Sequence, residues 1–280
     1  MKVAVIGVGL IGGSLALKLR EKKFSNNFVG IDTSEIHLQE AKELGIIDHA
    51  EDFETGIKTA DLIIVAIPVD ATVKVLPQVL DLITDKQTVM DAGSTKSGIA
   101  EAIKNHPRRD RYVAFHPMWG TENSGPKAAQ KESFSGRAAV ICDKQNSAED
   151  ALALVEKIAE TLEMNTIYMP SEDHDVHTAY ISHISHITSY ALANTVLEKE
   201  REEDTIFQLA SSGFSSTVRL AKSHPEMWVP IFKQNKENVL DVLNEHIAQL
   251  RKFKSALEKE NYELLEELIR NANKIRGILK

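Results

Sequence analysis

The sequence has 280 residues, enough for two domains with separate cores, and its 42% hydrophobic and 26% charged residues are ordinary for a soluble globular protein. A net charge of −8 without a long Lys/Arg run argues against a nucleic-acid partner. Cys142 is the only cysteine, no signal peptide is recognisable, and no apolar run approaches the roughly 18 residues of a membrane span, so we expect a cytoplasmic protein without an intramolecular disulfide or membrane contact.

The N-terminal stretch predicts a strand, a glycine-rich turn and a helix. The apolar strand Val3–Ile6 runs directly into the turn, and an apolar helical pattern follows it. The first glycine permits the tight turn, the second lets the backbone approach a pyrophosphate, and the third lets the helix pack close to the strand. We therefore expect a dinucleotide-binding unit whose cofactor lies against the turn residues Gly7, Val8, Gly9, Leu10, Ile11 and Gly12.

A dinucleotide-binding unit also needs an acidic residue about 20 positions after the turn, at the end of the second strand. The predicted strand Phe28–Asp32 supplies Asp32 at this spacing. Its carboxylate can accept hydrogen bonds from both ribose hydroxyls and would repel a 2′-phosphate, which predicts NAD in preference to NADP. Alternatively, Asp32 is only a helix N-cap, a role that Ser34 could also fill, and related turns bind FAD or S-adenosylmethionine.

The first 170 residues go on alternating short apolar strands with helices, which predicts a largely parallel sheet. Ala66 and Pro68, in the turn after one strand, should contact the cofactor together with the turn at Gly93–Ser94. Pro77 should divide the helix predicted over Asp70–Thr84. The further predicted strands are Leu62–Ile67, Thr88–Asp91, Tyr112–Phe115, Arg137–Cys142 and Asn165–Met169, and the further helices are Ser34–Leu44 and Ala148–Leu162.

After Pro170 the strand pattern ends, and only helices are predicted: Glu172–Lys199, Glu203–Leu209, Thr217–Ser223, Met227–Gln234, Lys236–Leu257 and Tyr262–Leu279. The last two are long and amphipathic, with a spacing close to a heptad seam. They either pack on each other within one chain or pair with a second copy, and we favour a homodimer. We therefore predict an α/β fold, with a Rossmann-type, mostly parallel sheet domain over residues 1–170 followed by an all-helical dimerisation domain over residues 171–280.

His116 is the first candidate catalytic residue. It directly follows the predicted strand Tyr112–Phe115, at the sheet edge where ligands bind. A histidine with an ordinary pKa of about 6.5 suits general acid–base chemistry at neutral pH. Oxidation of an alcohol needs such a base for the hydroxyl proton as the hydride leaves. The alternative is a structural histidine whose two nitrogens are both hydrogen-bonded.

The helical half carries two further candidate features. His183 and His186 share a helix face, and His174 and His177 repeat the spacing, but the two pairs do not share one face and no matching carboxylate pattern accompanies them. We therefore predict no metal site and expect core or helix-cap histidines, with a substrate contact by one of them as the alternative. Arg219 follows a loop of small residues, and its fixed charge suits a substrate carboxylate. The simpler interpretation is a surface arginine paired with a neighbouring acid.

Taken together, these stretches resemble the prephenate/arogenate dehydrogenase family of tyrosine biosynthesis. The resemblance covers nearly the whole chain, with the motifs in the family's order. Many dehydrogenases share the first motif, whereas the stretches that begin at His116 and at Ser211 are much more specific. The motifs are VIGVGLIGGSLA at 5–16, DAGSTK at 91–96, HPMWGTENSG at 116–125, SHISH at 182–186, SSGFSSTVRLAKSHPEMW at 211–228 and NKENV at 235–239.

The resemblance implies the NAD-dependent oxidative decarboxylation of prephenate to 4-hydroxyphenylpyruvate, with release of CO2. It implies that His116 acts on the ring hydroxyl and that Ser94 orients this histidine. Arg219 would bind the substrate carboxylate. The other substrate-binding residues that the resemblance implies are His183, Glu122, Trp228 and Gly213.

Three other interpretations stay open. The substrate could be arogenate, which differs from prephenate only in the side-chain amino group. A different two-domain NAD(P) dehydrogenase would place a lysine on the long interdomain helix, but Glu172–Lys199 has none before Lys199. A non-catalytic NAD-binding sensor would need neither His116 nor Arg219 near the nicotinamide.

Overall fold

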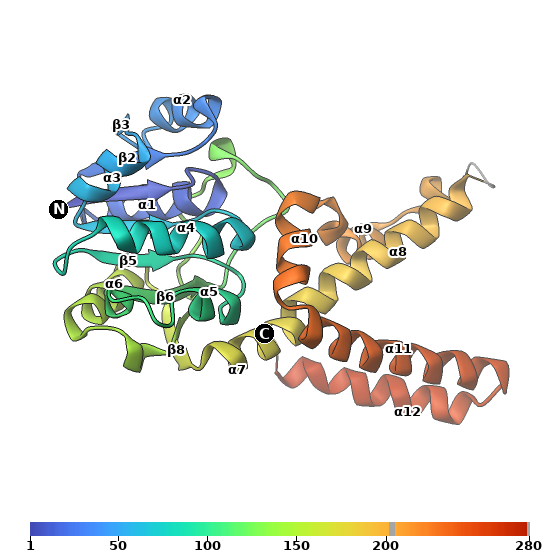
Figure 1. The fold of residues 1–280 in the computed structure, drawn as a ribbon. Coiled ribbons are helices and arrows are strands. Elements are labelled where there is room, and N and C mark those ends of the chain that lie inside the picture. The colour runs from blue at the N-terminus through green and yellow to red at the C-terminus, as the bar shows by residue number, and fades with distance from the viewer. Residues whose placement is uncertain (202–204, 279–280) are drawn as a thin grey trace. The chain divides into compact units, whose positions relative to one another are not determined.

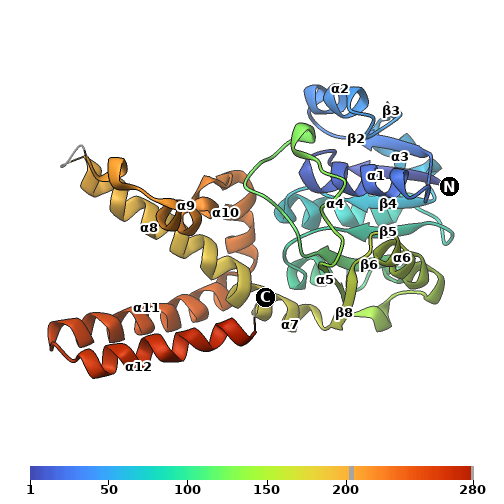
Figure 2. The ribbon, with the colours of Figure 1, turned by 180° about the vertical axis from the view of Figure 1, so that it is seen from behind.

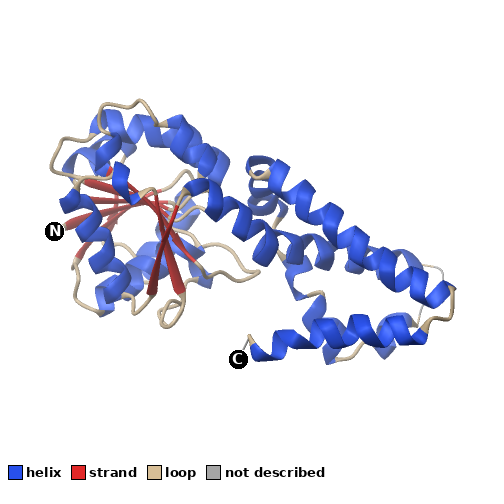
Figure 3. Cartoon of the chain, turned by 90° about the horizontal axis from the view of Figure 1, so that it is seen from below, coloured by secondary structure: helices blue, strands red, loops and turns tan. Residues whose placement is uncertain are grey.

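The structure is a computed structural model, and it describes residues 1–201 and 205–278. Met1–Asn235 forms one compact unit and Lys236–Lys280 forms another. Among the described residues, strands occur only in the first of these units, and the chain after the last strand is helical apart from its turns (Figure 3).

One sheet of eight strands organises the first unit, within the described residues (Figure 1). Its order is β3-β2-β1-β4-β5-β6-β7-β8; β1 to β6 run parallel, β7 runs antiparallel to β6, and β8 runs parallel to β7. This confirms the predicted Rossmann-type, mostly parallel sheet. The strands are β1 (Lys2–Ile6), β2 (Asn27–Ile31), β3 (His49–Ala50), β4 (Leu62–Val65), β5 (Thr88–Asp91), β6 (Tyr112–Pro117), β7 (Ala138–Cys142) and β8 (Asn165–Met169).

Alternate residues of the strands are buried on opposite faces, which explains why the strands read as continuous apolar runs. Val3 and Val5 belong to one core, with helices α1 (Leu10–Glu21), α2 (Glu35–Glu43) and α6 (Glu149–Thr161). Ala4 and Ile6 belong to the other core, with α3 (Phe53–Thr59), α4 (Val69–Leu82) and α5 (Ser97–Ala102). Figures 1 and 2 view the sheet from opposite sides.

Pro77 does not divide its helix, contrary to the prediction: α4 continues from Val69 to Leu82 with the proline inside it. A proline removes one backbone hydrogen bond and crowds the preceding turn. Here Leu76, Val79 and Leu80 are fully buried on both sides of the proline. Their burial holds the two turns in line, so tertiary packing overrides the local preference.

The long helix predicted over Glu172–Lys199, by contrast, is interrupted. It consists of α7 (Ser171–Thr178), a π-helical segment η4 (Ala179–His183) and α8 (Ile184–Glu200). Single π turns inside α-helices are rare and are frequent at functional sites. This one ends on His183.

The remaining described segments of the first unit are short. The predicted helix Thr217–Ser223 is divided between an α-helix and a 3₁₀ turn, and the first residues of the predicted helix Glu203–Leu209 lie outside the described residues. These segments are η5 (Ile206–Leu209), α9 (Ser212–Thr217), η6 (Arg219–Lys222) and α10 (Pro225–Gln234), and the sheet loops carry η1 (Arg109–Arg111), η2 (Pro126–Ala128) and η3 (Lys144–Asn146).

The second unit is a helical hairpin. Helices α11 (Lys236–Glu258) and α12 (Tyr262–Ala272) pack on each other, and η7 (Asn273–Gly277) follows α12. The end of the predicted helix Tyr262–Leu279 lies outside the described residues. Large apolar side chains stay exposed on this unit, among them Leu250, Leu257, Ile269 and Ile275.

Candidate active site

The glycine turn lies between β1 and α1, at the point where the strand order reverses between β1 and β4. Gly7 has φ +90°, and a Cβ there would lie 2.5 Å from the Ala66 carbonyl oxygen. A Cβ on Gly12 would lie 2.1 Å from the Gly7 carbonyl oxygen. A Cβ on Gly9 would meet nothing within 4 Å. The outer two glycines are therefore required by packing, whereas Gly9 faces the open space that a pyrophosphate needs.

Asp32 directly follows β2 and lies beside this turn. Its Oδ2 accepts a hydrogen bond from the Val8 N–H at 3.1 Å, and its Oδ1 accepts one from the Ser34 N–H at 2.9 Å. Ser34, and not Asp32, is the N-cap of α2, because its side chain accepts from the His37 N–H. The helix-cap alternative for Asp32 is therefore wrong, and each oxygen keeps a lone pair for a ligand.

The other predicted cofactor residues surround the turn. Leu10 is buried at the start of α1, and Ile11 packs against one of the two cores. The Ala66 carbonyl group lies close to Gly7 in the turn, and Pro68 is the N-cap residue of α4.

His116 is the fifth residue of β6, and the structure buries it beside a second histidine. Its Nδ1 lies 2.8 Å from His174 Nε2, with the two rings edge to face. Burial lowers the pKa of His116 well below its ordinary value, and the neighbouring His174, Lys96 and His183 lower it further. The ring is therefore neutral at pH 7. Its Nε2 makes no hydrogen bond to any described residue. This atom is not fully buried, so it is accessible.

Asp175 holds this histidine pair from the helical side. Its Oδ1 lies 2.8 Å from His174 Nδ1, and its two oxygens accept the backbone N–H groups of Lys96 and Ser97 at 2.8 and 2.9 Å. Burial raises the pKa of the Asp175 carboxyl, but the hydrogen bonds from His174, Ser97 and Lys96 outweigh it and leave the pKa below its ordinary value. Burial likewise lowers the pKa of His174, although Asp175 acts to raise it.

A buried ion pair lies behind His116. Lys96 Nζ is 2.6 Å from Asp91 Oδ2 and 2.6 Å from the carbonyl oxygen of Phe115, and both charged side chains are fully shielded from solvent. Asp91 Oδ1 accepts the Tyr112 hydroxyl at 2.7 Å, and burial followed by the Asp91 charge raises the pKa of Tyr112 well above its ordinary value. The tyrosine therefore stays protonated and donates to Asp91. Because Phe115 precedes His116, this network fixes the end of β6.

The π-helical segment places His183 in a second buried cluster. Its Nδ1 lies 3.2 Å from Asn235 Nδ2, and burial lowers its pKa to about 4. The Trp228 ring stacks on His186 at 3.4 Å between centroids and meets the edge of His183 at 5.9 Å. The indole Nε1 is buried without a hydrogen-bond partner among the described residues.

The remaining predicted residues are less enclosed. Arg219 Nη1 donates to Glu122 Oε2 at 3.0 Å across 97 residues of sequence, so Arg219 does pair with an acid, as the simpler interpretation has it. Ser94 lies in the turn between β5 and α5, and no described hydrogen bond joins it to His116. Gly213 is exposed in α9.

Sequence reasoning missed Asp91, Lys96, Asp175 and Asn235 as site residues, and it weighed His174 as a metal ligand or as a core or helix-cap histidine. A signal for three of them was present, since Asp91 and Lys96 open and close the DAGSTK stretch and Asn235 opens the NKENV stretch. Within residues 1–201 and 205–278, no group of three or more His, Cys, Asp or Glu side chains is arranged to hold a metal ion. Over the same residues, no helix is both long and apolar enough for a membrane span.

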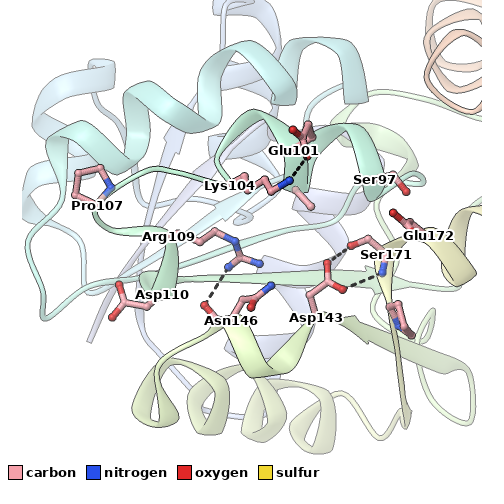
Figure 4. Close-up of a pocket in the computed structure, with 12 residues that line it drawn as sticks. Ser97, Glu101, Lys104, Pro107, Arg109, Asp110, Asp143, Asn146, Ser171 and Glu172 are labelled. Carbon is pink, nitrogen blue, oxygen red and sulfur yellow. Dashed lines mark hydrogen bonds and ion pairs between the residues drawn. The ribbon is translucent and has the colours of Figure 1, made fainter.

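A separate cavity of about 680 Å³ opens beside α5 and the start of α7 (Figure 4). Asp143 accepts the backbone N–H of Ser171 at 3.0 Å and also its hydroxyl, and Arg109 donates to the Asn146 carbonyl at 3.4 Å. None of the sequence-predicted site residues is among the described residues that line this cavity.

Comparison with known proteins identifies the family. The model of the prephenate dehydrogenase nucleotide-binding domain matches residues 15–168, and the model of the prephenate dehydrogenase dimerization domain matches residues 170–271. The chain belongs to the prephenate dehydrogenase family. It is thus an oxidoreductase-family chain with a nucleotide-binding and a dimerization domain, which confirms the resemblance drawn from its motifs.

Relatives that match nearly the whole of this chain support the family assignment. The chain is 31% identical to the prephenate dehydrogenase of Bacillus subtilis strain 168 over 98% of this chain and 75% of that protein. It is 28% identical to the cyclohexadienyl dehydrogenase of Zymomonas mobilis over 99% of this chain and 96% of that protein. Among solved structures, the A. aeolicus prephenate dehydrogenase in complex with hydroxyphenyl propionate and NAD+ superposes with a TM-score of 0.89 at 28% identity, covering 100% of this chain and 99% of that one.

Proposed function

We propose that this protein catalyses the NAD-dependent oxidative decarboxylation of prephenate to 4-hydroxyphenylpyruvate, with release of CO2, as a step of tyrosine biosynthesis. The observation that carries the proposal is the match of both family domains, in order, over residues 15–271. The names of the B. subtilis and A. aeolicus relatives favour prephenate as the substrate.

The residues of the glycine turn fit NAD. The open space at Gly9 suits the pyrophosphate, and Asp32 has lone pairs left for the ribose hydroxyls. A carboxylate at this point repels a 2′-phosphate, which favours NAD over NADP. When bound, NAD supplies the hydride acceptor. Its contacts would come from the glycine turn and from Ala66 and Pro68.

His116 is the proposed general base. Its neutral ring and accessible Nε2 suit it to take the proton of the ring hydroxyl while the same ring carbon gives up its hydride. The bond from the ring to the para carboxylate then breaks, CO2 leaves, and the electron pair completes the aromatic ring. His116 returns its proton to the phenolate oxygen, so the step consumes no net proton. Ser94 is proposed to orient the hydroxyl and His116.

Arg219 is the proposed anchor for a substrate carboxylate. Its side chain is half-exposed, and its pairing with the Glu122 carboxylate supports this role. A surface pair of this exposure contributes only about 0–1 kcal/mol to stability, so stability gives little reason to keep it. We propose that His183, Glu122, Trp228 and Gly213 also contact the substrate.

We further propose that the chain divides functionally into residues 1–170, which bind the nucleotide, and residues 171–280, which form a homodimer. The name of the second family domain and the exposed apolar side chains of α11 and α12 support the dimer. Sedimentation at micromolar concentration tests it, and a monomer under these conditions would contradict it.

Arogenate is the second candidate substrate. The Zymomonas relative is named a cyclohexadienyl dehydrogenase, and a Synechocystis arogenate dehydrogenase structure superposes with a TM-score of 0.78 at 25% identity. The deciding experiment is kcat/KM for prephenate and arogenate, each with NAD and NADP. We expect prephenate with NAD to give the highest value. A higher value for arogenate would reverse the substrate assignment, and NAD binding without turnover of either acid would mean a non-catalytic sensor.

A further inference from the structure

Asp175 is fixed as a hydrogen-bond acceptor at both carboxylate oxygens. The backbone N–H groups of Lys96 and Ser97 can only donate, and each lies within 2.9 Å of one oxygen. The residue is almost completely buried, and its hydrogen bonds from His174, Ser97 and Lys96 keep the pKa of the carboxyl below its ordinary value, so it is ionised and has no proton to donate. The carboxylate therefore provides a fixed reference from which the proton positions of its neighbours can be worked out.

The first hydrogen-bond chain runs from the Asp175 carboxylate through His174 to His116. His174 Nδ1 faces Asp175 Oδ1 at 2.8 Å and must donate, because the carboxylate only accepts. In a neutral imidazole the other nitrogen then accepts, so His174 Nε2 receives the proton of His116 Nδ1 at 2.8 Å. His116 is neutral in its buried position, and its second nitrogen, Nε2, is consequently the one without a proton.

The second hydrogen-bond chain starts from the backbone carbonyl of Asp175. Asn235 Nδ2 donates to this carbonyl at 2.6 Å, which identifies the amide nitrogen and excludes the flipped orientation. The same nitrogen lies 3.2 Å from His183 Nδ1. An amide nitrogen has only protons to give, so His183 Nδ1 accepts and its proton lies on Nε2.

We infer that Asp175 sets the two site histidines in opposite hydrogen-bonding states. Through His174 it makes His116 an acceptor at Nε2, and through Asn235 it makes His183 a donor at Nε2. This rests on the proposed function, because it gives the two rings complementary tasks toward one substrate. His116 accepts the proton of a hydroxyl, and His183 donates to an oxygen of the substrate's other end. Asp175, His174 and Asn235 are positioning residues that touch no reacting atom.

The arrangement favours an anionic substrate that has a hydroxyl at one end and a carbonyl or carboxylate oxygen at the other. With reversed proton positions, His116 would have no free nitrogen to take the hydroxyl proton, and it could not act as the base. His183 would present a lone pair to an oxygen that only accepts, so that contact would be repulsive. The geometry of the two chains thus selects the orientation of the substrate as well as the state of the base.

The direct test is the proton position in each ring, measured by ¹⁵N NMR of the full-length protein with labelled histidine and no substrate. Resonances of His116 and His183 are assigned from His116→Asn and His183→Asn. We expect a proton on Nδ1 of His116 and on Nε2 of His183. The opposite state in either ring would overturn the inference, whatever the enzyme's substrate.

Three variants separate positioning from mere structural support. In Asp175→Asn the side chain no longer accepts at both positions, so His174 loses its fixed acceptor and the His116 proton is no longer held on Nδ1 alone. His174→Asn keeps a donor near Asp175 but breaks only the link to His116, and so it serves if Asp175→Asn does not fold. Asn235→Ala should leave His116 unchanged and release the His183 proton to both nitrogens. Asp173→Asn is the matched control, since Asp173 is exposed on the same helix.

Activity supplies the second readout. We expect Asp175→Asn and His174→Asn to lower kcat by roughly 10²–10⁴-fold with a small change in KM, the size known for a base held in the wrong tautomer. Asn235→Ala should mainly raise KM. If kcat falls only in proportion to the fraction of folded protein, and the proton positions in both rings are unchanged, these residues merely support the structure. If the proton positions are as stated but no cyclohexadienyl acid is oxidised, the proposed function fails and the hydrogen-bonding states stand.

Discussion

Lys96→Met perturbs the buried centre of the site with little change of shape. The ammonium lies 2.6 Å from both Asp91 Oδ2 and the Phe115 carbonyl oxygen, and neither charged side chain reaches solvent. Methionine keeps most of the apolar stem but removes the charge and every donor. Asp91 is then a buried carboxylate whose remaining partners are the N–H groups of Gly93 and Phe115 and the Tyr112 hydroxyl.

The expected cost follows from these contacts. Removing one partner of a buried ion pair typically destabilises a protein by about 3–5 kcal/mol. The unpaired Phe115 carbonyl adds about 1 kcal/mol, whereas the three remaining donors to Asp91 reduce the penalty. We therefore expect Lys96→Met to lower the free energy of unfolding by about 3–5 kcal/mol. That is a large share of the roughly 5–15 kcal/mol by which an ordinary protein is stable.

Urea unfolding followed by tryptophan fluorescence measures this difference. Lys104→Met is the matched control, because Lys104 pairs with Glu101 at the surface, where both side chains are largely exposed, and its loss should cost less than about 0.5 kcal/mol. The double variant Asp91→Asn/Lys96→Met should be more stable than the sum of the two single changes predicts, because neither charge is then left alone. A Lys96→Met variant as stable as Lys104→Met would refute the view that this pair holds the end of β6.

Four further predictions concern the site. His116→Asn should lower kcat by roughly 10²–10⁴-fold with a modest change in KM; an unchanged kcat in steady-state assays would remove His116 from the chemistry. Arg219→Gln should raise KM for the substrate strongly while the matched Lys222→Gln does not, and equal KM values would place the carboxylate elsewhere. Asp32→Ala should weaken NAD and raise the NADP/NAD ratio of kcat/KM; a constant ratio would mean that Asp32 does not read the ribose. Burial lowers the pKa of His183 to about 4, so between about pH 4 and 6.5 the unfolded chain binds more protons than the folded one. The free energy of unfolding should therefore fall as the pH is lowered through this window, by at most about 1.4 kcal/mol per pH unit for this group. In urea titrations at pH 5 and 7, His183→Asn should lose this part of the pH dependence.

The features that the sequence predicted well are local ones. The glycine turn, its flanking strand and helix, and the acidic residue after β2 each follow from a few adjacent residues whose spacing has one mechanical explanation. The buried strands are equally legible, because both of their faces are covered and they read as continuous apolar runs. The position of His116 at the end of β6 follows directly from such a run.

The partners of His116 could not be predicted in this way. Its link to His174 spans 58 residues and joins a strand to a helix. A lysine such as Lys96 reads as a surface residue unless the pairing of β5 with β6 is known, since lysine is almost never fully buried without a partner. Periodicity also fails at the π-helical segment, because its wider turn rotates His183 relative to His174 and changes which side chains share a face.

An active site assembled from a strand and a helix must hold groups from both to a fraction of an ångström, since a misplacement of about 1 Å can cost about 10²-fold in rate. Asp175 meets that demand with short contacts in both directions. Its carboxylate is bound by backbone N–H groups at the start of α5, and its carbonyl is bound by Asn235 at the end of α10. Because backbone groups lack the freedom of side-chain rotamers, these contacts transmit the position of the sheet to the helical side. The proton positions of the two site histidines then depend on the fold itself and not on solvent.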